Sequence, residues 1–301
     1  MTDLLQISVV IPTYNRLDTL RYVIPALVAQ DLRSEQFEVI VADSNSTDGT
    51  AEFLAEIARS SANVRHLPGP YTGRAGARNA GIAAARAPIV LFTDADIIAS
   101  TDLLGRHLAR HAKGPNRAVI GCEIQVDSYD AYLRKSGNPA QRDPMHPPTR
   151  KHLTWLYFMT GNCSVRRSDL DRVGRFDEDF TGYGHEDLEL GYRLQHAGLT
   201  IEYAPEAVNY HWHPVPFDEQ QGRMELAGRS TVRFFRKHPT FDVRLRLGMT
   251  PLSLWLHDLI DRLPALRRWI DNGAKSPGFA RTLSFQYHYL TGIKAALRDP
   301  S

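Results

Sequence analysis

The stretch "PIVLFTDAD", residues 88–96, joins a short apolar run to a pair of aspartates. An apolar run of this length, without polar alternation, is typical of a β-strand that is covered on both faces. The aspartates, Asp94 and Asp96, follow the run directly. We therefore predict a buried strand that presents carboxylates at its carboxyl end.

Strands and helices alternate along the first third of the chain. The predicted strands are "ISVVIP" (7–12), "FEVIVAD" (37–43) and "PIVLFTD" (88–94), and the predicted helices cover 17–30, 47–59 and 72–86. This alternation predicts an α/β fold with a mostly parallel, doubly wound sheet and helices on both faces. Ligands of such sheets bind at the carboxyl ends of the strands.

The middle of the chain is less regular than the first third. Two strands are predicted there, over 117–126 and 157–167. A loop rich in proline and polar residues covers 136–149, and a helix is predicted over 186–196. Gly198 stands where a glycine commonly ends a helix. We expect the loop to be mobile.

Composition limits the class of protein. With 301 residues, 43% hydrophobic and 23% charged, the chain is long enough for one large domain, or for a domain with an appendage. A net charge of +2 gives no reason to expect nucleic acid as a partner. The chain has only two cysteines and no apolar run of the roughly 18 to 20 residues that span a bilayer, which predicts a cytoplasmic protein.

Acidic side chains stand where the predicted strands end. Asp43 closes the second strand, and Asp94 and Asp96 follow the third. In a parallel sheet these ends converge on one crevice, where neighbouring carboxylates repel unless a cation joins them. Asp94-Ala95-Asp96 therefore predicts a site for Mg2+ or Mn2+ together with substrate phosphates. The alternative is that one aspartate caps the next helix and the other is solvated.

The segment "GPYTGRAGARNAG", residues 69–81, places Arg74 and Arg78 one turn apart at the start of a helix. Helix N-termini and guanidinium groups both bind phosphate. The alternative is an ordinary solvated helix face. The position of this segment, between the strands that end at Asp43 and Asp94, favours a role at the ligand crevice.

These segments occur in the order found in family 2 glycosyltransferases. Over about residues 6–212, "SVVIPTYNR", "VADSNSTDGT", "GARNAGIAAA", "LFTDAD" and the downstream pair Glu186-Asp187 resemble the motifs of that family. The resemblance implies an inverting enzyme of the GT-A fold that uses a nucleotide sugar. The segment "GYGHEDLELGYRL" also resembles the Gly-Trp-Gly-x-Glu-Asp element of chondroitin-polymerase and galactosyltransferase-like enzymes, with Tyr183 in the place of tryptophan.

The resemblance places the donor at the strand ends. It implies that Pro12, Thr13 and Tyr14 line a pocket for the nucleobase and ribose. Asp43 would bond to uracil, with Arg74 nearby. Asp94 would contact the ribose or the donor sugar, and Asp96 would hold a metal on the diphosphate. The expected donor is UDP-linked. Asp43 is followed by a serine where many relatives have a second acid, so the chain departs from the family pattern at the expected nucleobase contact.

A carboxylate pair would supply the base. Direct displacement at the anomeric carbon needs a group that removes the proton of the acceptor hydroxyl. Asp187 matches the base of the family, and Glu186 is expected to bind a sugar hydroxyl. Both lie in the first turn of a predicted helix, where the dipole favours the ionised form. Without the resemblance, acids at this position are ordinary helix stabilisers.

Further contacts follow from the resemblance. In relatives that complete the metal site with histidine, the ligand comes from the region of "NYHWHP", and His211 is the expected ligand here. An imidazole ligand favours Mn2+ over Mg2+. Gly161 and Asn162, in "TGNCSVRR", and Tyr183 are expected to contact the donor sugar or the acceptor.

The C-terminal part of the chain differs from the rest. We expect a GT-A catalytic domain over 1–216, with a nucleotide-sugar half to about residue 115 and an acceptor half after it, and a helical appendage over 217–301. The appendage has 14 basic and 8 acidic residues and an apolar helix face between Leu252 and Leu263. That face is expected to pack on the chain, to form a homodimer, or to lie on the inner face of a membrane beside a lipid-linked acceptor.

The sequence therefore predicts a metal-dependent inverting hexosyltransferase that acts on a saccharide, lipid-linked or small-molecule acceptor. The alternative is a sugar-phosphate nucleotidyltransferase, which shares an α/β sheet and acidic metal ligands but needs no base at Asp187. A zinc protease is disfavoured, because Glu189 stands where the His-Glu-x-x-His motif that begins at His185 requires a second histidine.

Overall fold

The computed structural model describes residues 5–144, 148–212, 216–273 and 278–299. Contacts within the chain divide it into two compact units, which are described separately. The sheet unit comprises Met1–Asp179 and Glu186–Pro214, and the helical unit comprises Phe180–His185 and Val215–Ser301. A short segment directly before Glu186 therefore belongs with the C-terminal helices and not with the sheet.

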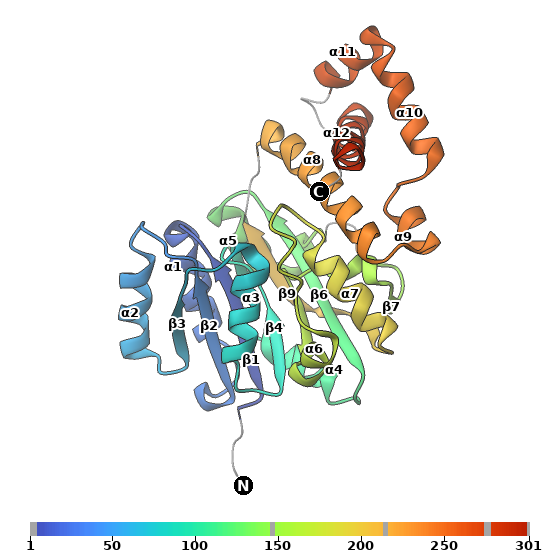
Figure 1. The fold of residues 1–301 in the computed structure, drawn as a ribbon. Coiled ribbons are helices and arrows are strands. Elements are labelled where there is room, and N and C mark those ends of the chain that lie inside the picture. Colours follow the sequence, from blue (N-terminus) through green and yellow to red (C-terminus); the bar gives the residue numbers. More distant parts are fainter. Residues whose placement is uncertain (1–4, 145–147, 213–215, 274–277, 300–301) are drawn as a thin grey trace. The chain divides into compact units, whose positions relative to one another are not determined.

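Within the described residues, the sheet unit is built on a nine-stranded sheet (Figure 1). They are β1 (Ile7–Thr13), β2 (Phe37–Asp43), β3 (Val64–Pro68), β4 (Ile89–Phe92), β5 (Ile97–Ala99), β6 (Arg117–Val126), β7 (His152–Leu153), β8 (Cys163–Arg166) and β9 (Thr200–Trp212). Eight follow the order β3-β2-β1-β4-β8-β6-β9-β5, and β7 pairs with β9. The first four in this order are parallel, β8 is antiparallel to both its neighbours, and β6 and β9 are parallel. The predicted α/β fold is confirmed.

In the part of this unit that the structure describes, seven α-helices and three short 3-10 helices accompany these strands. They are α1 (Leu17–Val28), α2 (Thr50–Ser60), α3 (Gly73–Ala84), α4 (Leu103–His111), α5 (Tyr129–Gly137), α6 (Arg167–Val173) and α7 (Glu186–His196), with η1 (Ser34–Gln36), η2 (Pro139–Gln141) and η3 (Trp155–Tyr157). The strand predicted over 157–167 is wrong in its first half, since η3 and a turn precede β8. The loop predicted over 136–149 contains η2, and its residues 145–147 lie outside the described residues.

Alternate residues of β1 face opposite sides of the sheet. Ile7, Val9 and Ile11 belong to the core that includes the buried face of α1. On the other face α3 approaches so closely that a Cβ at Gly81 would lie 2.3 Å from Val10 Cγ1 (Figure 1). Because both faces are covered, the strand has no solvent-facing positions, and its sequence is apolar almost throughout.

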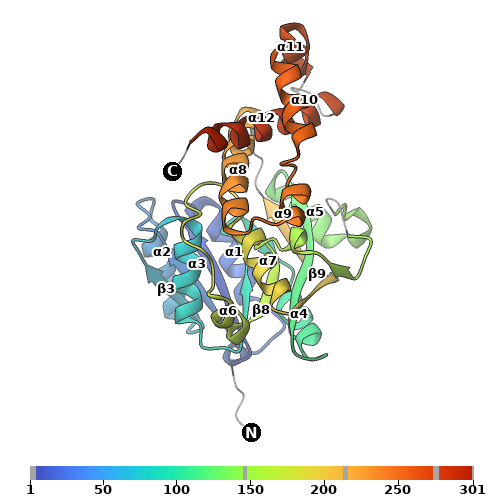
Figure 2. The same cartoon turned by 45° about the vertical axis from the view of Figure 1, so that its right-hand side comes forward.

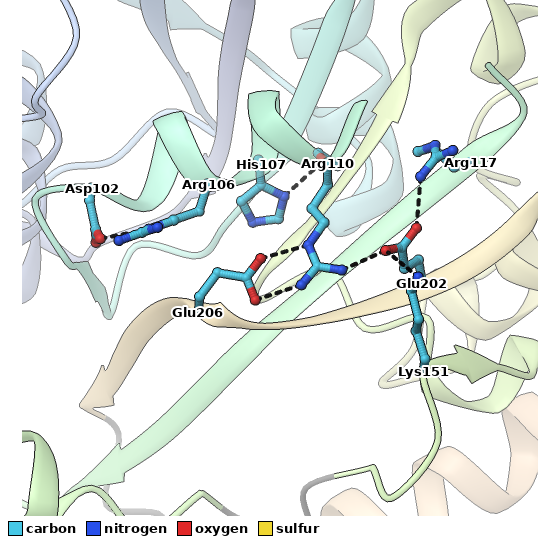
Figure 3. Close-up of polar contacts among 9 residues, drawn as sticks. Asp102, Arg106, His107, Arg110, Arg117, Lys151, Glu202 and Glu206 are labelled. Atoms are coloured by element: carbon cyan, nitrogen blue, oxygen red, sulfur yellow. Dashed lines mark hydrogen bonds and ion pairs between the residues drawn. The ribbon is translucent and has the colours of Figure 1, made fainter. Parts of the chain in front are cut away.

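A network of ion pairs fastens α4 to β9 (Figure 3). Arg110 donates to Glu202 at 2.5 Å and to the two oxygens of Glu206 at 2.6 and 2.7 Å. Arg117 donates to the second oxygen of Glu202 at 2.8 Å. The Glu202 side chain is 4% exposed, so its charge depends on both arginines. The network fixes the start of β9, the strand whose last residues lie beside Asp96.

The helical unit contains α8 (Phe217–Lys237), α9 (Phe241–Arg246), α10 (Pro251–Asp261), α11 (Pro264–Gly273) and α12 (Phe279–Arg298), with α12 crossing α8 (Figure 2). Two glycines allow this crossing. A Cβ at Gly228 would lie 2.0 Å from the carbonyl oxygen of Tyr289, and a Cβ at Gly292 would lie 2.0 Å from that of Glu225. Among the described residues, no helix combines the length and the apolar character needed to cross a bilayer.

The segment Phe180–His185 is bound within the helical unit. His185 Nε2 lies 2.6 Å from Thr231 Oγ1, and Ser230 Oγ donates to the carbonyl oxygen of Tyr183 at 3.1 Å. His185 has a φ of 74°, which is uncommon for a residue with a side chain. Burial lowers the pKa of His185 to about 4, so the ring is neutral at physiological pH. These contacts give His185 a structural role.

Candidate active site

The site begins where the chain leaves β4. Asp94 and Asp96 follow this strand, and β5 starts directly after them. β5 pairs with the end of β9, where Trp212 N donates to the carbonyl oxygen of Asp96 at 2.8 Å. This pairing brings His211 Nε2 within 3.6 Å of Asp96 Oδ1. Two residues that are far apart in the sequence thus offer an oxygen and a nitrogen ligand at one place.

Arg78 joins the aspartates to the carboxylate pair of α7. Its side chain is buried, and it donates to Asp94 Oδ1 at 2.9 Å and to Glu186 Oε1 at 3.0 Å. Three elements, α3, the end of β4 and the start of α7, therefore meet at one guanidinium group. The phosphate-binding role suggested by the spacing of Arg74 and Arg78 is wrong for Arg78, because its donors face carboxylates inside the protein.

Arg74 is exposed in the first turn of α3. Burial raises the pKa of Asp94, but the charges of Arg78, Arg74 and His211 outweigh it and leave that pKa below its usual value. Asp94 is therefore ionised in a strongly cationic environment. An exposed arginine at a helix N-terminus is suited to an anionic ligand.

Asp187 is a carboxyl group with unusual proton affinity. Burial and the neighbouring charge of Glu186 raise the pKa of Asp187 to about 7, although Arg78 acts in the opposite direction. Leu188 N donates to Asp187 Oδ1 at 2.8 Å and orients the group. A carboxyl group that gains and loses its proton near neutral pH can act as a general base.

Glu186 is buried beside Asp187. One of its oxygens accepts from Arg78, and the other, Oε2, is buried without a hydrogen-bond partner among the described residues. A buried acceptor of this kind is costly unless a ligand or water donates to it. The predicted contact of Glu186 with a sugar hydroxyl is compatible with this oxygen.

His211 lies between two carboxylates. Its Nδ1 is 3.1 Å from Glu123 Oε1, on the side of the ring away from Asp96. Burial lowers the pKa of His211, but Glu123 and Asp96 raise it more, so that the pKa lies above its usual value. Carboxylate oxygen and imidazole nitrogen are both ligands of Mn2+. Ligand atoms 3.6 Å apart can bind a single ion, so the donor set fits the predicted metal.

One other cluster among the described residues has metal-ligand spacing. It consists of His257, Asp258 and Asp261 in the helical unit. Lys294 Nζ donates to Asp258 and lies 3.4 Å from His257 Nδ1. A lysine ammonium group already supplies the positive charge there, so this cluster is an ion-pair network and not a competing metal centre.

The predicted nucleobase pocket lies at the end of β1. Pro12 is partly buried, Thr13 is buried with its Oγ1 unpartnered among the described residues, and the Tyr14 side chain is 61% exposed. The following residue, Asn15, accepts from Thr47 N at 2.8 Å, which ties this loop to the loop after β2. An exposed aromatic ring beside an unpartnered hydroxyl suits the binding of a base and a ribose.

Asp43 is buried at the end of β2. Its Oδ1 accepts from Ser46 N at 3.1 Å and Ser46 Oγ at 2.5 Å, and its Oδ2 is 3.1 Å from His66 Nε2. A uracil N–H would therefore have to share an oxygen that already accepts. These hydrogen bonds hold the loop after β2, and the predicted bond from Asp43 to uracil stays a prediction.

The predicted contacts with the sugar differ in their surroundings. Asn162 is buried, its Nδ2 donates to the carbonyl oxygens of Cys122 and Ala207, and its Oδ1 lies 2.9 Å from His107 Nε2. These bonds use both amide hydrogens and one lone pair of the side chain, and the predicted contact of Asn162 with the donor sugar or the acceptor stays a prediction. Gly161, one residue earlier, lies beside Glu123.

Tyr183 belongs to the helical unit. The guanidinium carbon of Arg223 lies 5.2 Å from the centre of its ring, in the geometry of a cation–π contact. The ring is half-buried. Its predicted contact with sugar stays a prediction.

Glu123 is a polar residue of this site that no sequence motif marks. This residue lies in the middle of β6, where one acid in a strand gives no motif. Only the parallel pairing of β6 with β9, which places Glu123 and Gln125 beside His211, reveals it. A sequence signal existed only in the alternation of "CEIQV", which places polar side chains at every second position.

Comparisons with known proteins identify the family to which the chain is similar. Residues 8–174 match the family described as glycosyl transferase family 2, and residues 145–214 match the N-terminal domain of galactosyltransferase. Validoxylamine A glucosyltransferase of Streptomyces hygroscopicus subsp. jinggangensis is 33% identical over 78% of this chain and 61% of its own length. Chondroitin synthase of Escherichia coli is 27% identical over 77% of this chain and 39% of its own. The chain thus spans less than two thirds of either relative.

A solved structure gives the same fold. The mannosyltransferase of Pyrobaculum calidifontis in complex with GDP-Man and Mn2+ has a TM-score of 0.67 at 20% identity, with 98% of this chain and 88% of that chain covered. TarS 1-349 of S. aureus in complex with UDP has a TM-score of 0.57 at 19% identity, with 97% and 91% covered. The expected GT-A fold with C-terminal helices is thereby confirmed.

Proposed function

The chain belongs to glycosyl transferase family 2, and from this premise we propose that it transfers a sugar from a nucleotide sugar to a hydroxyl group of a carbohydrate, lipid-linked or small-molecule acceptor, with inversion at the anomeric carbon. UDP is the expected nucleotide. A sugar-phosphate nucleotidyltransferase would need no base, and the titration of Asp187 near neutral pH favours the glycosyltransferase.

The bridge made by Arg78 carries this proposal. Its bonds to Asp94 and Glu186 hold the donor-side aspartates next to the carboxylate pair of α7. A displacement reaction needs the site of the leaving group and the base to be adjacent. Without this bridge, the carboxylates of the two acidic motifs would repel one another with little compensation.

A divalent ion, expected to be Mn2+, would be held by Asp96 and His211. When bound, it supplies positive charge that stabilises the departing nucleoside diphosphate. Asp94 would contact the ribose or the donor sugar. Arg74, exposed at the N-terminus of α3, would contact the donor. The solved mannosyltransferase with a similar fold contains Mn2+, which supports a metal here.

Asp187 would act as the base. Its ionised carboxylate takes the proton of the acceptor hydroxyl while the hydroxyl oxygen bonds to the anomeric carbon from the side opposite the leaving group. The bond between the anomeric carbon and the diphosphate oxygen breaks, and its electron pair leaves with the nucleoside diphosphate. Glu186 would accept a hydrogen bond from a sugar hydroxyl at its unpartnered Oε2.

Base and ribose would bind where Pro12, Thr13 and Tyr14 meet Asp43. The stacking surface would come from Tyr14, and a hydrogen bond from Thr13. The related solved structures contain UDP in one case and GDP-Man in the other, so both nucleotides belong in the test. Gly161, Asn162 and Tyr183 are kept as expected contacts of the sugar or acceptor.

The helical unit would provide contacts to partners. Its helices α10 and α11 expose a stripe of large apolar side chains: Leu252, Trp255, Leu256, Leu259, Leu263, Leu266 and Trp269. Packing within the described part of the chain leaves this stripe exposed. We propose that a second copy of the chain covers it, so that the protein forms a homodimer.

The decisive test is a panel of UDP-, GDP- and TDP-linked sugars with Mn2+, Mg2+ or a chelator. We expect one UDP-sugar to raise the melting temperature in Mn2+ but not with chelator, and to be slowly hydrolysed to UDP. The variant Asp96→Asn should lose both effects, and Glu56→Gln, an exposed change on α2, should keep them. Release of pyrophosphate from a nucleoside triphosphate and a sugar phosphate would instead establish a nucleotidyltransferase.

A further inference from the structure

The polar face shared by β6 and β9 lies next to the expected metal ligands. In the parallel pairing Glu123 is opposite Asn209 and Gln125 is opposite His211, so all four side chains lie on one face of the sheet. Residues between them, such as Cys122 and Ile124, belong to the core on the other face. Glu123 is thus held in a strand and not in a loop.

Glu123 and Gln125 both lie within hydrogen-bond distance of His211 Nδ1. Its Oε1 lies 3.1 Å from His211 Nδ1. An ionised carboxylate only accepts hydrogen bonds, so this contact requires a proton on Nδ1. In the neutral ring the lone pair is then on Nε2, the nitrogen 3.6 Å from Asp96 Oδ1. That is the tautomer in which His211 can bind a metal beside Asp96.

Gln125 makes the assignment depend on Glu123. Its Nε2 lies 2.7 Å from Glu123 Oε1 and 3.1 Å from His211 Nδ1. If Gln125 donated to Nδ1, the ring proton would move to Nε2 and block metal binding. With Glu123 present, Gln125 Nε2 and His211 Nδ1 can both donate to Glu123 Oε1, so Gln125 need not donate to His211 Nδ1.

Gly161 leaves room for the second oxygen of Glu123. A Cβ at position 161 would lie 2.6 Å from Glu123 Oε2. No real Cβ comes so close to an oxygen, so any larger residue would displace the carboxylate. Asn209 Nδ2 donates to the carbonyl oxygen of Gly161 at 2.8 Å and fixes this backbone position. The absence of a side chain at Gly161 therefore serves the placement of Glu123.

We propose that Glu123 is a positioning residue of the metal site, which holds His211 in the Nδ1–H tautomer with Nε2 directed at the ion shared with Asp96. This inference rests on the proposed function, in which Asp96 and His211 bind the metal. Gly161 is part of the same arrangement, in addition to any contact with the sugar.

Metal affinity without any nucleotide sugar tests the proposal. Binding of Mn2+ can be followed through the electron paramagnetic resonance signal of the free ion. Glu123→Gln keeps the size of the side chain but introduces a donor, and we expect it to weaken binding by about 10- to 100-fold, the range typical of outer-shell partners. Gly161→Ala should weaken binding in the same direction, while Gln125→Ala should change it by less than about threefold, well below that range.

The tautomer can be read directly. The 15N shifts of the His211 ring, in metal-free protein at a pH where the ring is neutral, should show hydrogen on Nδ1 in the natural chain and a larger share on Nε2 in Glu123→Gln. A purely structural role of Glu123 would lower the melting temperature and leave the tautomer unchanged. Comparison with His211→Ala assigns the signals.

The outcomes distinguish a failure of the metal assignment from a failure of the role proposed for Glu123. If His211→Ala leaves Mn2+ affinity unchanged, the metal assignment within the proposed function fails. If His211→Ala weakens binding but Glu123→Gln and Gly161→Ala do not, the metal assignment stands and the role of Glu123 is overturned. If Gln125→Ala weakens binding as much as Glu123→Gln, the tautomer is set by Gln125 and the proposal is wrong.

Discussion

Asp187 is the residue whose protonation should control turnover. With a pKa of about 7, its carboxyl is mostly protonated below neutral pH and cannot act as a base. We expect kcat/KM to rise with pH up to an apparent pKa near this value. Asp187→Asn should lower kcat by about 10²- to 10⁴-fold and remove this rise. Glu56→Gln is the matched control and should keep the profile of the natural chain.

The same carboxyl should affect stability in the opposite direction. The pKa of an aspartate is ordinarily 3.8, as in the unfolded chain, and that of Asp187 is about 7 after folding, so between these values the folded state holds a proton that the unfolded state has lost. Stability therefore decreases as pH rises through this window. Urea unfolding at acidic and at mildly alkaline pH should show a smaller decrease for Asp187→Asn. An equal decrease in both proteins would contradict the burial of this charge.

Arg78 should contribute more to the stability of the folded chain than an exposed arginine does. Arg78→Met leaves Glu186 and Asp94 without their common partner, and removing one member of a buried ion pair costs about 3–5 kcal/mol. Arg106→Met is the control, because Arg106 forms an exposed ion pair with Asp102 (Figure 3), and water screens such a pair so that it contributes little to stability. Urea unfolding measures both. Similar losses for the two variants would contradict the bridging role.

For single residues, the sequence indicates which side chains belong to the site better than it indicates which partners each side chain contacts. Asp94 and Asp96 stand at a strand end, and His211 and Asp187 were assigned through their resemblance to family motifs; the structure brings them together. The burial of Arg78 and of Asn162 could not be predicted, because it depends on which face of α3 or which side of β8 meets the rest of the chain. Periodicity marks a face but does not show what covers it.

At the scale of elements, the ends of α7 were predicted well. The helix runs from Glu186 to His196, and Gly198 with a φ of 92° follows it, since acids at the start and glycine after the end are local signals. The first half of the strand predicted over 157–167 failed for a physical reason. Apolar residues such as Phe158 are buried there, and burial alone does not distinguish a strand from a turn.

The crossing of α8 and α12 depends on two glycines, which gives a prediction for these elements. Gly228→Ala or Gly292→Ala would place a methyl group 2.0 Å from a backbone oxygen of the other helix, and no side-chain rotation relieves such a clash. We expect a loss of about 1–3 kcal/mol, as for other overpacked sites, and faster hydrogen exchange along α12.

Gly222 provides the control for this crossing. It lies on the same helix, α8, and a Cβ there would meet nothing within 4 Å. Gly222→Ala should stabilise the helical unit by about 0.5–1 kcal/mol, because alanine is the better helix former. If all three variants behaved alike, the helices would not be held together by their close approach at Gly228 and Gly292.

At the scale of the whole molecule, the exposed stripe on α10 and α11 needs a partner. Its seven side chains are each between 37% and 64% exposed, and together they present on the order of 700 Å2, close to the ~800 Å2 that each partner contributes to a stable interface. Asp258 and Asp261 lie on the same helix as much of the stripe, and basic residues on α11 lie near its other end. Mixed charge of this kind favours a second copy over an anionic membrane.

We therefore expect the chain to sediment as a dimer at high concentration and to dissociate on dilution. Trp255→Ser combined with Leu259→Ser should give a monomer at every concentration, because two large apolar side chains leave the centre of the stripe. Leu226→Ser removes an exposed leucine on α8, outside the stripe, and should leave the dimer intact. A natural chain that stays monomeric and floats with vesicles containing phosphatidylglycerol would show that a membrane, and not a second copy, covers these helices.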